Sequence, residues 1–435
     1  MRRDLLDDLR KWKEDESRKP LILKGVRQCG KTYLLEEFGE KYYQDTAYFN
    51  FEENDALKEV FDKDYDIPRI MFELDLQHQK KIEPQNTLII FDEIQECGRA
   101  LTSLKYFCEK APEYHIVCAG SLLGIALQNH LSFPVGKVDF MTLYPMSFTE
   151  FLRGCGEDTL ADFVKNYKKE DSLPKIAANK LEEFLRQYYI VGGMPEAVDS
   201  WRKKHDIQAV ERIQQNIINS YELDFAKHAP TKEFPKLQAI WRSIPEQLSK
   251  ENKKFIFSQV KASWRAKDLE DALEWLIGAG LVYKVRRIEK PFLPLSAYAE
   301  DRAFKLYMAD IGILRKLSKL PYDIILNSTD IYKEFKGALA ENYVLGELVK
   351  AVDDTAYYWT SGNTAEVDFV IQCKNEIVPI EVKAQQHLKA RSLDEYRRKY
   401  SPKHAVKTSM LGEVSNDEPL KIPLYMINKI GTFIE

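Results

Sequence analysis

The chain has 435 residues, enough for about two to four domains, and its 44% hydrophobic and 30% charged composition excludes a protein that is disordered as a whole. Lys and Arg number 64 against 68 Asp and Glu, and the formal net charge of -4 excludes a globally basic nucleic-acid coat, although not a local basic patch. No apolar run reaches the ~18 residues of a transmembrane helix, the N-terminus is too charged for a signal peptide, and the six cysteines form no CxxC pair. These features predict a cytoplasmic protein with reduced thiols and no membrane partner.

Apolar strands and helices alternate over the first third of the chain. After an amphipathic helix expected within residues 1–17, the expected order is strand 21–26, helix 32–43, strand 46–53, strand 87–93, helix 99–112 and strand 115–121. The run TLIIFDE at 87–93 is typical of a strand buried on both faces. Strands that alternate with helices need crossover connections, so this region predicts an α/β fold with a parallel sheet.

The pattern then changes twice. Residues 150–230 are expected to be helical, 235–290 to be helices that end in the strand LVYKVRRI, and 291–330 to be a connector with a short helix. Helices followed by a short hairpin favour a winged-helix module. After residue 330, one helix, three strands and a basic helical segment predict a separate α/β domain. The predicted domains are 1–155, 156–232, 233–325 and 326–435.

Residues 25–32 read GVRQCGKT and fit the pattern G-x-x-x-x-G-K-[ST] in full, between an expected strand and an expected helix. Glycines let the backbone turn so that N–H groups face phosphate oxygens, and the N-terminus of the helix adds partial positive charge. Lys31 is expected to reach the β- and γ-phosphates, and Thr32 is expected to ligate Mg²⁺. The sequence therefore predicts an ATP site whose cofactor-binding residues include Gly25, Gln28, Cys29, Gly30, Lys31 and Thr32.

Two acidic residues end the apolar strand at 87–93. Asp92 can hold Mg²⁺ through water, and Glu93 is the natural group to polarise an attacking water. Ser121 closes the next strand, where a polar side chain would face the γ-phosphate; a Ser that caps the following helix is the alternative, and both can hold. The predicted catalytic residues are Lys31, Glu93 and Ser121. The spacing of residues along the sequence does not identify an arginine finger, that is, an arginine that would reach the γ-phosphate.

The motifs LILKGVRQCGKTYLL, NTLIIFDEIQEC, HIVCAGSLLGIAL, FPVGKVDFMTLYPMSFTEFL and YYIVGGMPEAV make this part of the chain resemble an AAA+ superfamily ATPase. The chain is similar in particular to a prokaryotic family of ATPases whose C-terminal half is a domain of unknown function. In that resemblance Asp92 and Glu93 are the Walker B pair and Ser121 is the sensor. Gly193 and Pro195 resemble the Gly-x-Pro turn that approaches the nucleotide in signal-transduction ATPases with numerous domains, so Pro195 joins the expected nucleotide contacts.

Four polar residues of the C-terminal region fall where they can converge. Glu341 lies in line with the apolar stripe of the helix expected at 337–352, where a carboxylate is least expected. In the strand AEVDFVI, Asp368 points away from the apolar side chains, and in EIVPIEVKA Glu381 and Lys383 share the face opposite the apolar one. The four side chains can therefore meet on one side of a small sheet.

The spacing of Asp368, Glu381 and Lys383 resembles the PD-(D/E)xK nuclease fold, with Val367 in place of the Pro of the motif's name. The resemblance implies that Asp368 and Glu381 hold Mg²⁺, that Glu341 joins the metal shell, and that Lys383 positions or activates the attacking water. An amphipathic strand pair with a solvated charged face is the alternative.

Basic residues follow this pair of strands. The segment from Lys383 to Lys407 contains eight Lys and Arg residues and only two acidic residues, Asp394 and Glu395. The segment, in which tyrosines interleave, can follow a phosphate backbone or be a solvated helix face. The helix expected at 265–277 is acidic on its exposed side, which favours a lid or a protein contact over sequence-specific DNA reading.

The sequence thus predicts an α/β protein with a P-loop AAA+ parallel-sheet domain, a helical and winged-helix middle region, and a restriction-endonuclease-like α/β domain. Its expected function is an ATP-hydrolysing, Mg²⁺-dependent switch coupled to the C-terminal domain. That domain either acts on DNA as a nuclease or is an inactive module that binds a protein partner. An oligomer in which a neighbour supplies an arginine also stays open.

Overall fold

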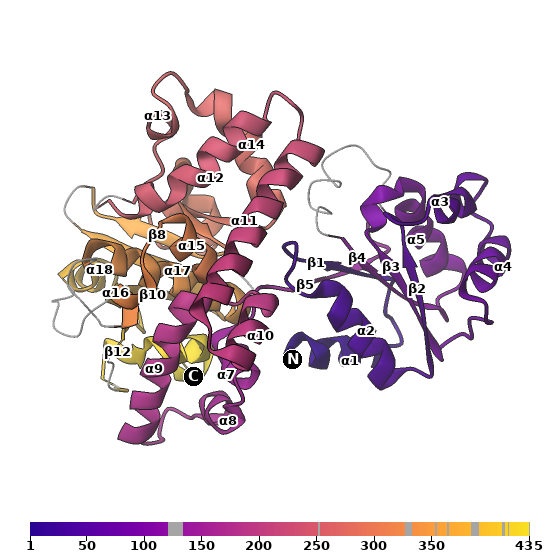
Figure 1. Cartoon of the computed structure of the whole chain (residues 1–435). Coiled ribbons are helices and arrows are strands. Elements are labelled where there is room, and N and C mark those ends of the chain that lie inside the picture. Colours follow the sequence, from indigo (N-terminus) through magenta and orange to yellow (C-terminus); the bar gives the residue numbers. More distant parts are fainter. Residues whose placement is uncertain are drawn as a thin grey trace. The chain divides into compact units, whose positions relative to one another are not determined.

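The computed structural model describes residues 1–120, 134–250, 253–326, 333–352, 355–362, 365–383, 391–410, 414–415 and 417–434. The chain forms two compact units, Met1–Tyr144 with Gly278–Gly280, and Pro145–Ile277 with Leu281–Glu435. Each unit is built around its own β-sheet (Figure 1).

The first unit is an α/β fold with a parallel sheet of five strands in the order β2-β3-β4-β1-β5. The strands are β1 (Leu21–Lys24), β2 (Asp45–Asn50), β3 (Thr87–Asp92), β4 (His115–Ala119) and β5 (Asp139–Thr142). The helical elements are α1 (Leu5–Glu14), α2 (Lys31–Tyr42), α3 (Asp55–Asp62), α4 (Ile67–His78), η1 (Ile94–Glu96) and α5 (Gly98–Lys110). Every residue of β3 and β4 is buried, which confirms the parallel sheet expected from the apolar runs.

Aromatic side chains fill the core on the α3–α5 side of this sheet. The rings of Phe51, Phe61 and Phe91 lie with their centroids 5.5 to 5.8 Å apart, in tilted and edge-to-face pairs. Such pairs stabilise a core beyond the area that they bury. Phe91 precedes Asp92, so the packing of this cluster fixes the end of β3, where the acidic residues of the site begin.

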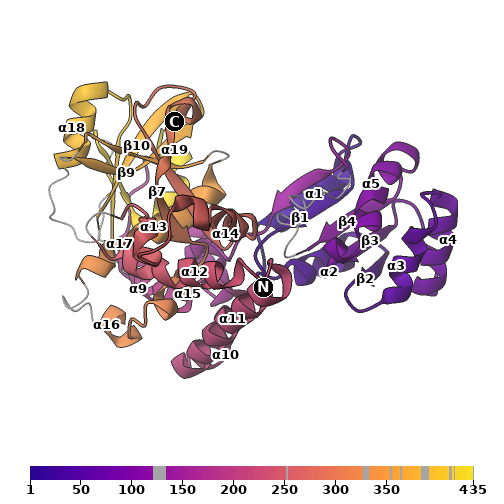
Figure 2. The same ribbon diagram turned by 90° about the horizontal axis from the view of Figure 1, so that it is seen from above.

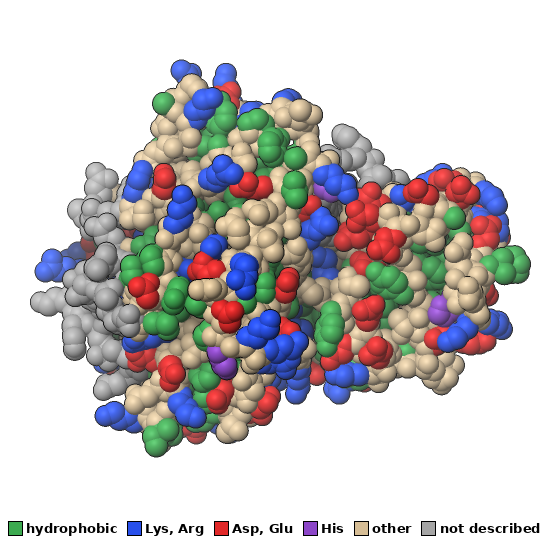
Figure 3. All heavy atoms as spheres, viewed as in Figure 1, with side chains coloured by type: hydrophobic (Ala, Val, Ile, Leu, Met, Phe, Trp, Pro, Cys, Tyr) green, Lys and Arg blue, Asp and Glu red, His purple; other side chains and the backbone are tan. Residues whose placement is uncertain are grey.

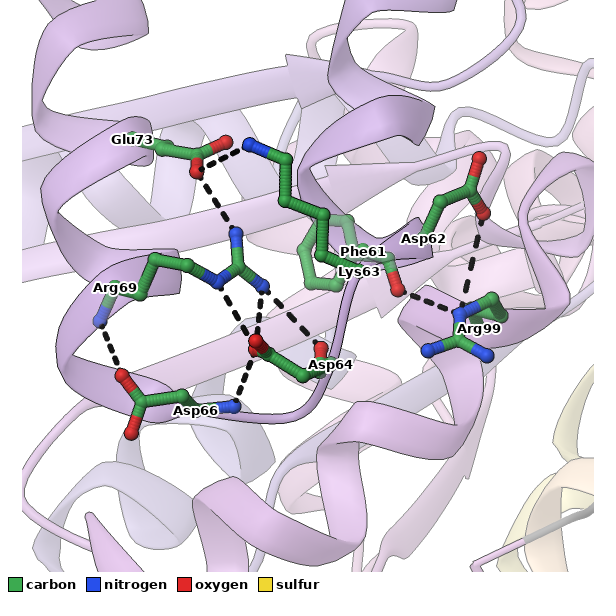
Figure 4. Close-up of polar contacts among 8 residues, drawn as sticks. All are labelled: Phe61, Asp62, Lys63, Asp64, Asp66, Arg69, Glu73 and Arg99. Atoms are coloured by element: carbon green, nitrogen blue, oxygen red, sulfur yellow. Dashed lines mark hydrogen bonds and ion pairs between the residues drawn. The ribbon is translucent and has the colours of Figure 1, made fainter.

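A polar network joins the surface of α3, α4 and α5 (Figure 4). Arg69 of α4 lies 2.9 Å from Asp64 and 2.8 Å from Glu73, while Arg99 of α5 donates a hydrogen bond of 2.6 Å to the carbonyl of Phe61. The loop between α3 and α4 is therefore tied to α4, and the end of α3 is tied to α5.

The second unit begins with helices. They are α7 (Phe148–Gly154), α8 (Asp158–Asn166), α9 (Lys175–Val191), α10 (Pro195–Lys204), α11 (Ile207–His228), α12 (Phe234–Leu248), α13 (Phe257–Val260) and α14 (Ala266–Gly278). The expected helix at 181–198 is divided between α9 and α10, because Gly192 adopts a φ of 75° and Pro195 starts a new helix.

A mixed sheet of seven strands, in the order β12-β11-β10-β9-β8-β6-β7, forms the rest of the unit. Its strands are β6 (Val282–Ile288), β7 (Ala299–Met308), β8 (Tyr357–Thr360), β9 (Glu366–Cys373), β10 (Glu376–Lys383), β11 (Val406–Ser409) and β12 (Leu420–Pro423). The accompanying helical elements are η2 (Leu295–Tyr298), α15 (Ile311–Leu317), α16 (Tyr322–Leu326), α17 (Lys333–Ala351), α18 (Arg391–Tyr400), η4 (Leu424–Lys429) and α19 (Ile430–Ile434).

The hairpin β6–β7 corrects one expectation. Residues 291–330 contain the strand β7 in addition to short helices, where only a connector with a short helix was expected. β6 also pairs in parallel with β8, so the hairpin belongs to the larger sheet, of which β7, β9 and β10 are labelled in Figure 2. The boundary expected near residue 326 therefore falls inside one sheet, since two of its strands precede that residue and five follow it.

None of the helices in the described part of the chain has both the length and the apolar content needed to cross a lipid bilayer.

Candidate functional site

The loop between β1 and α2 has the backbone turns that a phosphate-binding loop needs. Gly25, Gln28 and Gly30 all have positive φ angles, of 154°, 66° and 91°. A Cβ atom at residue 25 would lie 2.3 Å from the carbonyl oxygen of Leu143, so only glycine fits there. The loop leads directly into α2, whose first residue is Lys31. The N-terminal amides of this helix thus lie at the loop, where they favour an anion.

Lys31 is bonded to the loop itself. Its side chain is 7% exposed, and Nζ donates hydrogen bonds of 2.9 and 3.0 Å to the carbonyl oxygens of Gly25 and Val26. The ammonium group is therefore held beside the expected phosphate position. Its contact with the β- and γ-phosphates remains a prediction.

Asp92 connects β3 with the loop. One of its carboxylate oxygens, Oδ2, accepts hydrogen bonds from Thr32 Oγ1 at 2.7 Å and from the Tyr48 hydroxyl at 2.8 Å. The structure thus joins Thr32 and Asp92, the two residues predicted to hold Mg²⁺. Hard hydroxyl and carboxylate oxygens are the donors that this ion prefers, so the pair fits it chemically.

Tyr48 is a site residue that the sequence did not reveal. It lies on β2 and donates to Asp92, and burial, followed by the neighbouring Asp92 carboxylate, raises the pKa of its hydroxyl. The signal was present in the alternation of β2, because Tyr48 shares a face with Asn50, which pairs with Asp92 in the β2–β3 register.

Glu93 follows β3 in a left-handed conformation, with φ of 48°. A non-glycine residue in that region is uncommon, and such strain often occurs at functional sites. Its Oε2 accepts a hydrogen bond from the side-chain amide of Gln95, and its own N–H donates to Asp92 Oδ1 at 3.0 Å. Ser121, the expected sensor, lies outside the described residues.

Arg3 is hydrogen-bonded both to the phosphate-binding loop and to the peptide that follows β5. Its guanidinium, in a residue that is only 4% exposed, donates hydrogen bonds of 2.9 Å to the carbonyl of Cys29 and 2.6 Å to the carbonyl of Tyr144. No motif marks this residue in the sequence. The contact shows that α1 and the loop are fixed to the segment that leaves the first unit.

Pro195 belongs to the second unit, where it is the first residue of α10. The preceding turn is rigid: Gly193 N–H donates to Asp310 Oδ2 at 2.6 Å, and Gly193 O accepts from Met146 N–H at 2.7 Å. Burial raises the pKa of Asp310. The contact of Pro195 with nucleotide remains a prediction.

The second unit brings together the four polar residues expected to converge. Glu341 on α17 is 3% exposed, and it accepts a hydrogen bond of 2.9 Å from the Tyr307 hydroxyl on β7. Asp368 Oδ2 on β9 accepts a bond of 2.8 Å from the N–H of Val382 on β10. Glu381 is paired with Lys383 on the same strand at 2.5 Å. Among the described residues, its other oxygen, Oε2, is buried and has no hydrogen-bond partner.

The charges of this cluster act on one another. Burial, with the nearby Glu341 and Glu381 carboxylates, raises the pKa of Asp368 well above its usual value, and burial also raises that of Glu381. Burial alone would also raise the pKa of Glu341, but the ammonium groups of Lys253 and Lys305 hold that pKa below the usual value. The three carboxylates therefore lie within electrostatic reach of one another.

Two further lysines contact the carboxylates of this cluster. Lys253 is bonded to Glu341 Oε1, and Lys305 Nζ lies 3.9 Å from Glu341 Oε2 and 2.5 Å from Glu366 Oε1. Across the described ranges, no three His, Cys, Asp or Glu side chains are grouped as ligands of a metal ion. In the state described, the carboxylates of the cluster are paired with ammonium groups.

The described part of the basic segment contains α18, and the ring of its Tyr396 is not free to stack on bases. Tyr396 is 1% exposed, and its ring packs edge-to-face on Trp359 with 5.2 Å between the centroids; Tyr400 contacts the same indole at 5.7 Å. Tyr396 therefore belongs to the core under the helix, and the half-buried Tyr400 packs against that core.

Comparison with curated proteins finds no match to the chain. Among solved structures, a Walker-type ATPase of Pyrococcus abyssi is 16% identical, with 72% of this chain and 95% of that chain covered and a TM-score of 0.47. The RuvB Holliday junction branch migration motor of Thermotoga maritima is 14% identical, with 64% of this chain and 86% of that chain covered and a TM-score of 0.29. A third structure is a signal-transduction ATPase with numerous domains from Pyrococcus horikoshii, which has a tetratricopeptide repeat sensor. It is 11% identical, with 79% of this chain and 45% of that chain covered and a TM-score of 0.27.

Three family models match separate parts of the chain. Residues 182–323 and 336–425 match domains of unknown function (DUF8612 and DUF4143). Residues 17–152 match an AAA domain, and this segment contains the loop, Asp92 and Glu93. The first unit, an α/β fold with a parallel sheet, is accordingly similar to an AAA domain.

Proposed function

We propose that the chain is an ATP-binding and ATP-hydrolysing switch. The observation that carries this proposal is the hydrogen bond of 2.7 Å between Thr32 and Asp92, because it joins the loop and the end of β3 into one site. The match of residues 17–152 to an AAA domain supports the same assignment.

Each residue has a defined part in this function. The amides at the start of α2 and the ammonium group of Lys31 bind the β- and γ-phosphates. Thr32 and Asp92 would hold Mg²⁺, which neutralises phosphate charge when it is bound. Glu93 accepts a proton from the water that attacks the γ-phosphate, and Ser121 is proposed to contact that phosphate. Pro195 is proposed as a further nucleotide contact.

The test separates binding from hydrolysis. Lys31→Ala should abolish ATP binding in calorimetry, whereas Glu93→Gln should bind ATP and lose turnover by roughly a hundredfold or more. Lys41→Ala is the matched control, because that lysine is on the same helix but forms an exposed pair with Glu37. Unchanged turnover in Glu93→Gln would reject the role of Glu93. A rise of turnover per molecule with protein concentration would support an arginine supplied by a neighbouring copy.

For the second unit we propose a nuclease-like module that the ATPase controls. Three carboxylates, of Glu341, Asp368 and Glu381, lie near Lys383, and phosphodiester hydrolysis uses such a set of hard ligands with an ammonium group. DNA is the proposed substrate. In the first unit, the face seen in Figure 3 gathers acidic side chains over α3, so we propose that DNA contacts the second unit instead.

An inactive module that binds a protein partner is the alternative. The pairing of Glu341 with Lys253 and Lys305 favours it, because buried ion pairs of this kind also occur as structural elements. Cleavage assays with Mg²⁺ or Mn²⁺ and ATP distinguish the two. Cleavage that is lost in Asp368→Ala and Lys383→Ala supports the nuclease, and no cleavage of any DNA or RNA form supports the binding module.

A further inference from the structure

A cleft in the second unit lies apart from both sites, and none of the described residues that line it belongs to either. It has a volume of about 1600 Å³ and is lined by α11, α12, the end of α15, α16 and the first turn of α17, so we call it the α11 cleft. One wall is the face of α11 from Gln208 to Glu222, a span of about 21 Å at about 1.5 Å per residue. The volume exceeds the ~300–1,000 Å³ of sites for small molecules, and the length matches about six residues of extended chain. These dimensions favour a peptide as the ligand.

Two sets of ion pairs fix the walls of the α11 cleft. Glu222 of α11 accepts two hydrogen bonds, of 3.0 and 2.8 Å, from the guanidinium of Arg242 on α12. Glu211 of α11 pairs with Arg315 Nη2 at 2.7 Å and with Lys316 Nζ at 2.5 Å, both from α15. Because α11 is joined in this way to both of its neighbours, the walls are positioned without a ligand. A peptide that enters such a cleft has less ordering entropy to lose.

The lining of the α11 cleft carries an excess of positive charge. Of the described residues that line it, five are Lys or Arg and three are Glu, and one of these carboxylates, Glu211, is shared between two cations. Arg212 is 70% exposed and lies 4.0 Å from Asp206, at the limit of an ion pair. Lys319, which follows α15 with a φ of 55°, is also exposed. Exposed cations beside a cleft attract a ligand of negative charge.

Other parts of the lining are apolar or carry amide groups. Ile218 is buried and Phe335 half-buried, whereas Tyr322 is 37% exposed and offers its ring as a contact surface. On α11, the side chains of Gln215 and Asn219 are joined by a hydrogen bond of 3.0 Å. Each side-chain amide has more than one donor and acceptor site, so this pair can also bond to a peptide backbone. The cleft thus offers contacts to the backbone, to carboxylates and to apolar side chains of a peptide.

We propose that the α11 cleft binds an extended acidic peptide segment of a partner protein, whose carboxylates meet Arg212 and Lys319 and whose apolar side chains pack on Tyr322. The inference goes beyond the ATPase and nuclease-like functions. For the alternative in which the second unit binds a protein, it names the surface and the chemistry of the partner. It rests on neither the ATP site nor the carboxylates around Asp368, so its failure leaves both of those proposals standing.

The experiment measures the binding of labelled eight-residue peptides to the nucleotide-free full-length chain by fluorescence anisotropy. In these peptides Glu, Gln or Lys alternates with Leu, Val, Phe or Tyr. The tightest Glu peptide should bind roughly tenfold or more better than its Gln counterpart, and Arg212→Glu should weaken its binding by roughly tenfold or more. Lys227→Glu is the matched control and should bind this peptide about as the wild type does. It makes the same change of net charge at an exposed residue of α11 outside the lining of the cleft.

Three results overturn the inference. Equal affinity of the Glu peptide for Arg212→Glu and Lys227→Glu places its binding outside the cleft. Tighter binding of the Lys peptides, or no binding of any peptide, contradicts an acidic peptide as the ligand. A dimer of the chain alone in analytical ultracentrifugation, if Arg212→Glu dissociates it, assigns the cleft to a second copy instead. Circular dichroism confirms that each variant is folded, and Lys319→Glu replaces Arg212→Glu if the latter is not.

Discussion

Replacing Arg3 with Met would test how the phosphate-binding loop is held. The substitution keeps much of the apolar stem but removes the donors to the carbonyls of Cys29 and Tyr144. Cys29 is buried and Tyr144 half-buried, and a buried carbonyl left without its donor costs about 1–3 kcal/mol. We therefore expect the unfolding free energy of the first unit to fall by about 2–4 kcal/mol. For a unit of this size the midpoint of thermal unfolding should fall by roughly 5–15 °C.

Arg2→Met is the matched control. Arg2 pairs with Asp7 at 3.5 Å, but the two side chains are 56% and 43% exposed, so that pair should contribute less than about 1 kcal/mol. Differential scanning calorimetry gives the midpoints, and hydrogen exchange of the Cys29 and Gly30 amides reports the loop directly. Arg3→Met should also weaken ATP binding, because the loop loses an anchor. Equal midpoints for the two variants, within about 2 °C, would refute the reasoning.

Three further predictions concern other parts of the chain. Tyr48→Phe removes one hydrogen bond to Asp92 and should raise the Mg²⁺ concentration needed for half-maximal ATP turnover; an unchanged value would reject the orienting role of Tyr48. Burial raises the pKa of Glu347, so the native state binds this proton more tightly than the unfolded state, and stability should fall as the pH rises above 4.5. Glu347→Gln should reduce that fall in urea unfolding between about pH 5 and about pH 8, and an identical fall would contradict the assignment. A fragment of residues 326–435 lacks β6, β7 and Lys305, so it should show no cooperative thermal unfolding, whereas 145–435 should; cooperative unfolding of the shorter fragment would restore the boundary at 326.

The site in the first unit was accessible to sequence analysis because its chemistry is local. The loop GVRQCGKT and the pair Asp92–Glu93 are contiguous, and each lies at the end of an apolar strand whose burial the sequence indicates. Tyr48 and Arg3 were not identified, because they contact the site from 44 and 26 residues away along the chain. Spacing in sequence does not show such contacts until the order and register of the strands are known.

The second unit shows the same limit more strongly. The faces of β9 and β10 followed from the alternation of their side chains, so Asp368 and Glu381 could be placed on one face. The partner strand of β6 could not be derived, since a hairpin pattern identifies a local pair but not the sheet that it joins. Lys305 offered a signal that was not used: a lysine within the apolar run AFKLYM implies a buried charge that needs acidic partners.

The segment Leu143–Tyr144 ends the first unit, and Pro145 begins the second. The carbonyl of Leu143 is the group that a side chain at Gly25 would strike, and Arg3 joins the carbonyl of Tyr144 to that of Cys29. The connecting peptide and the loop thus share one set of backbone contacts. A change in the backbone of the loop would therefore alter the contacts of the peptide that ends the first unit.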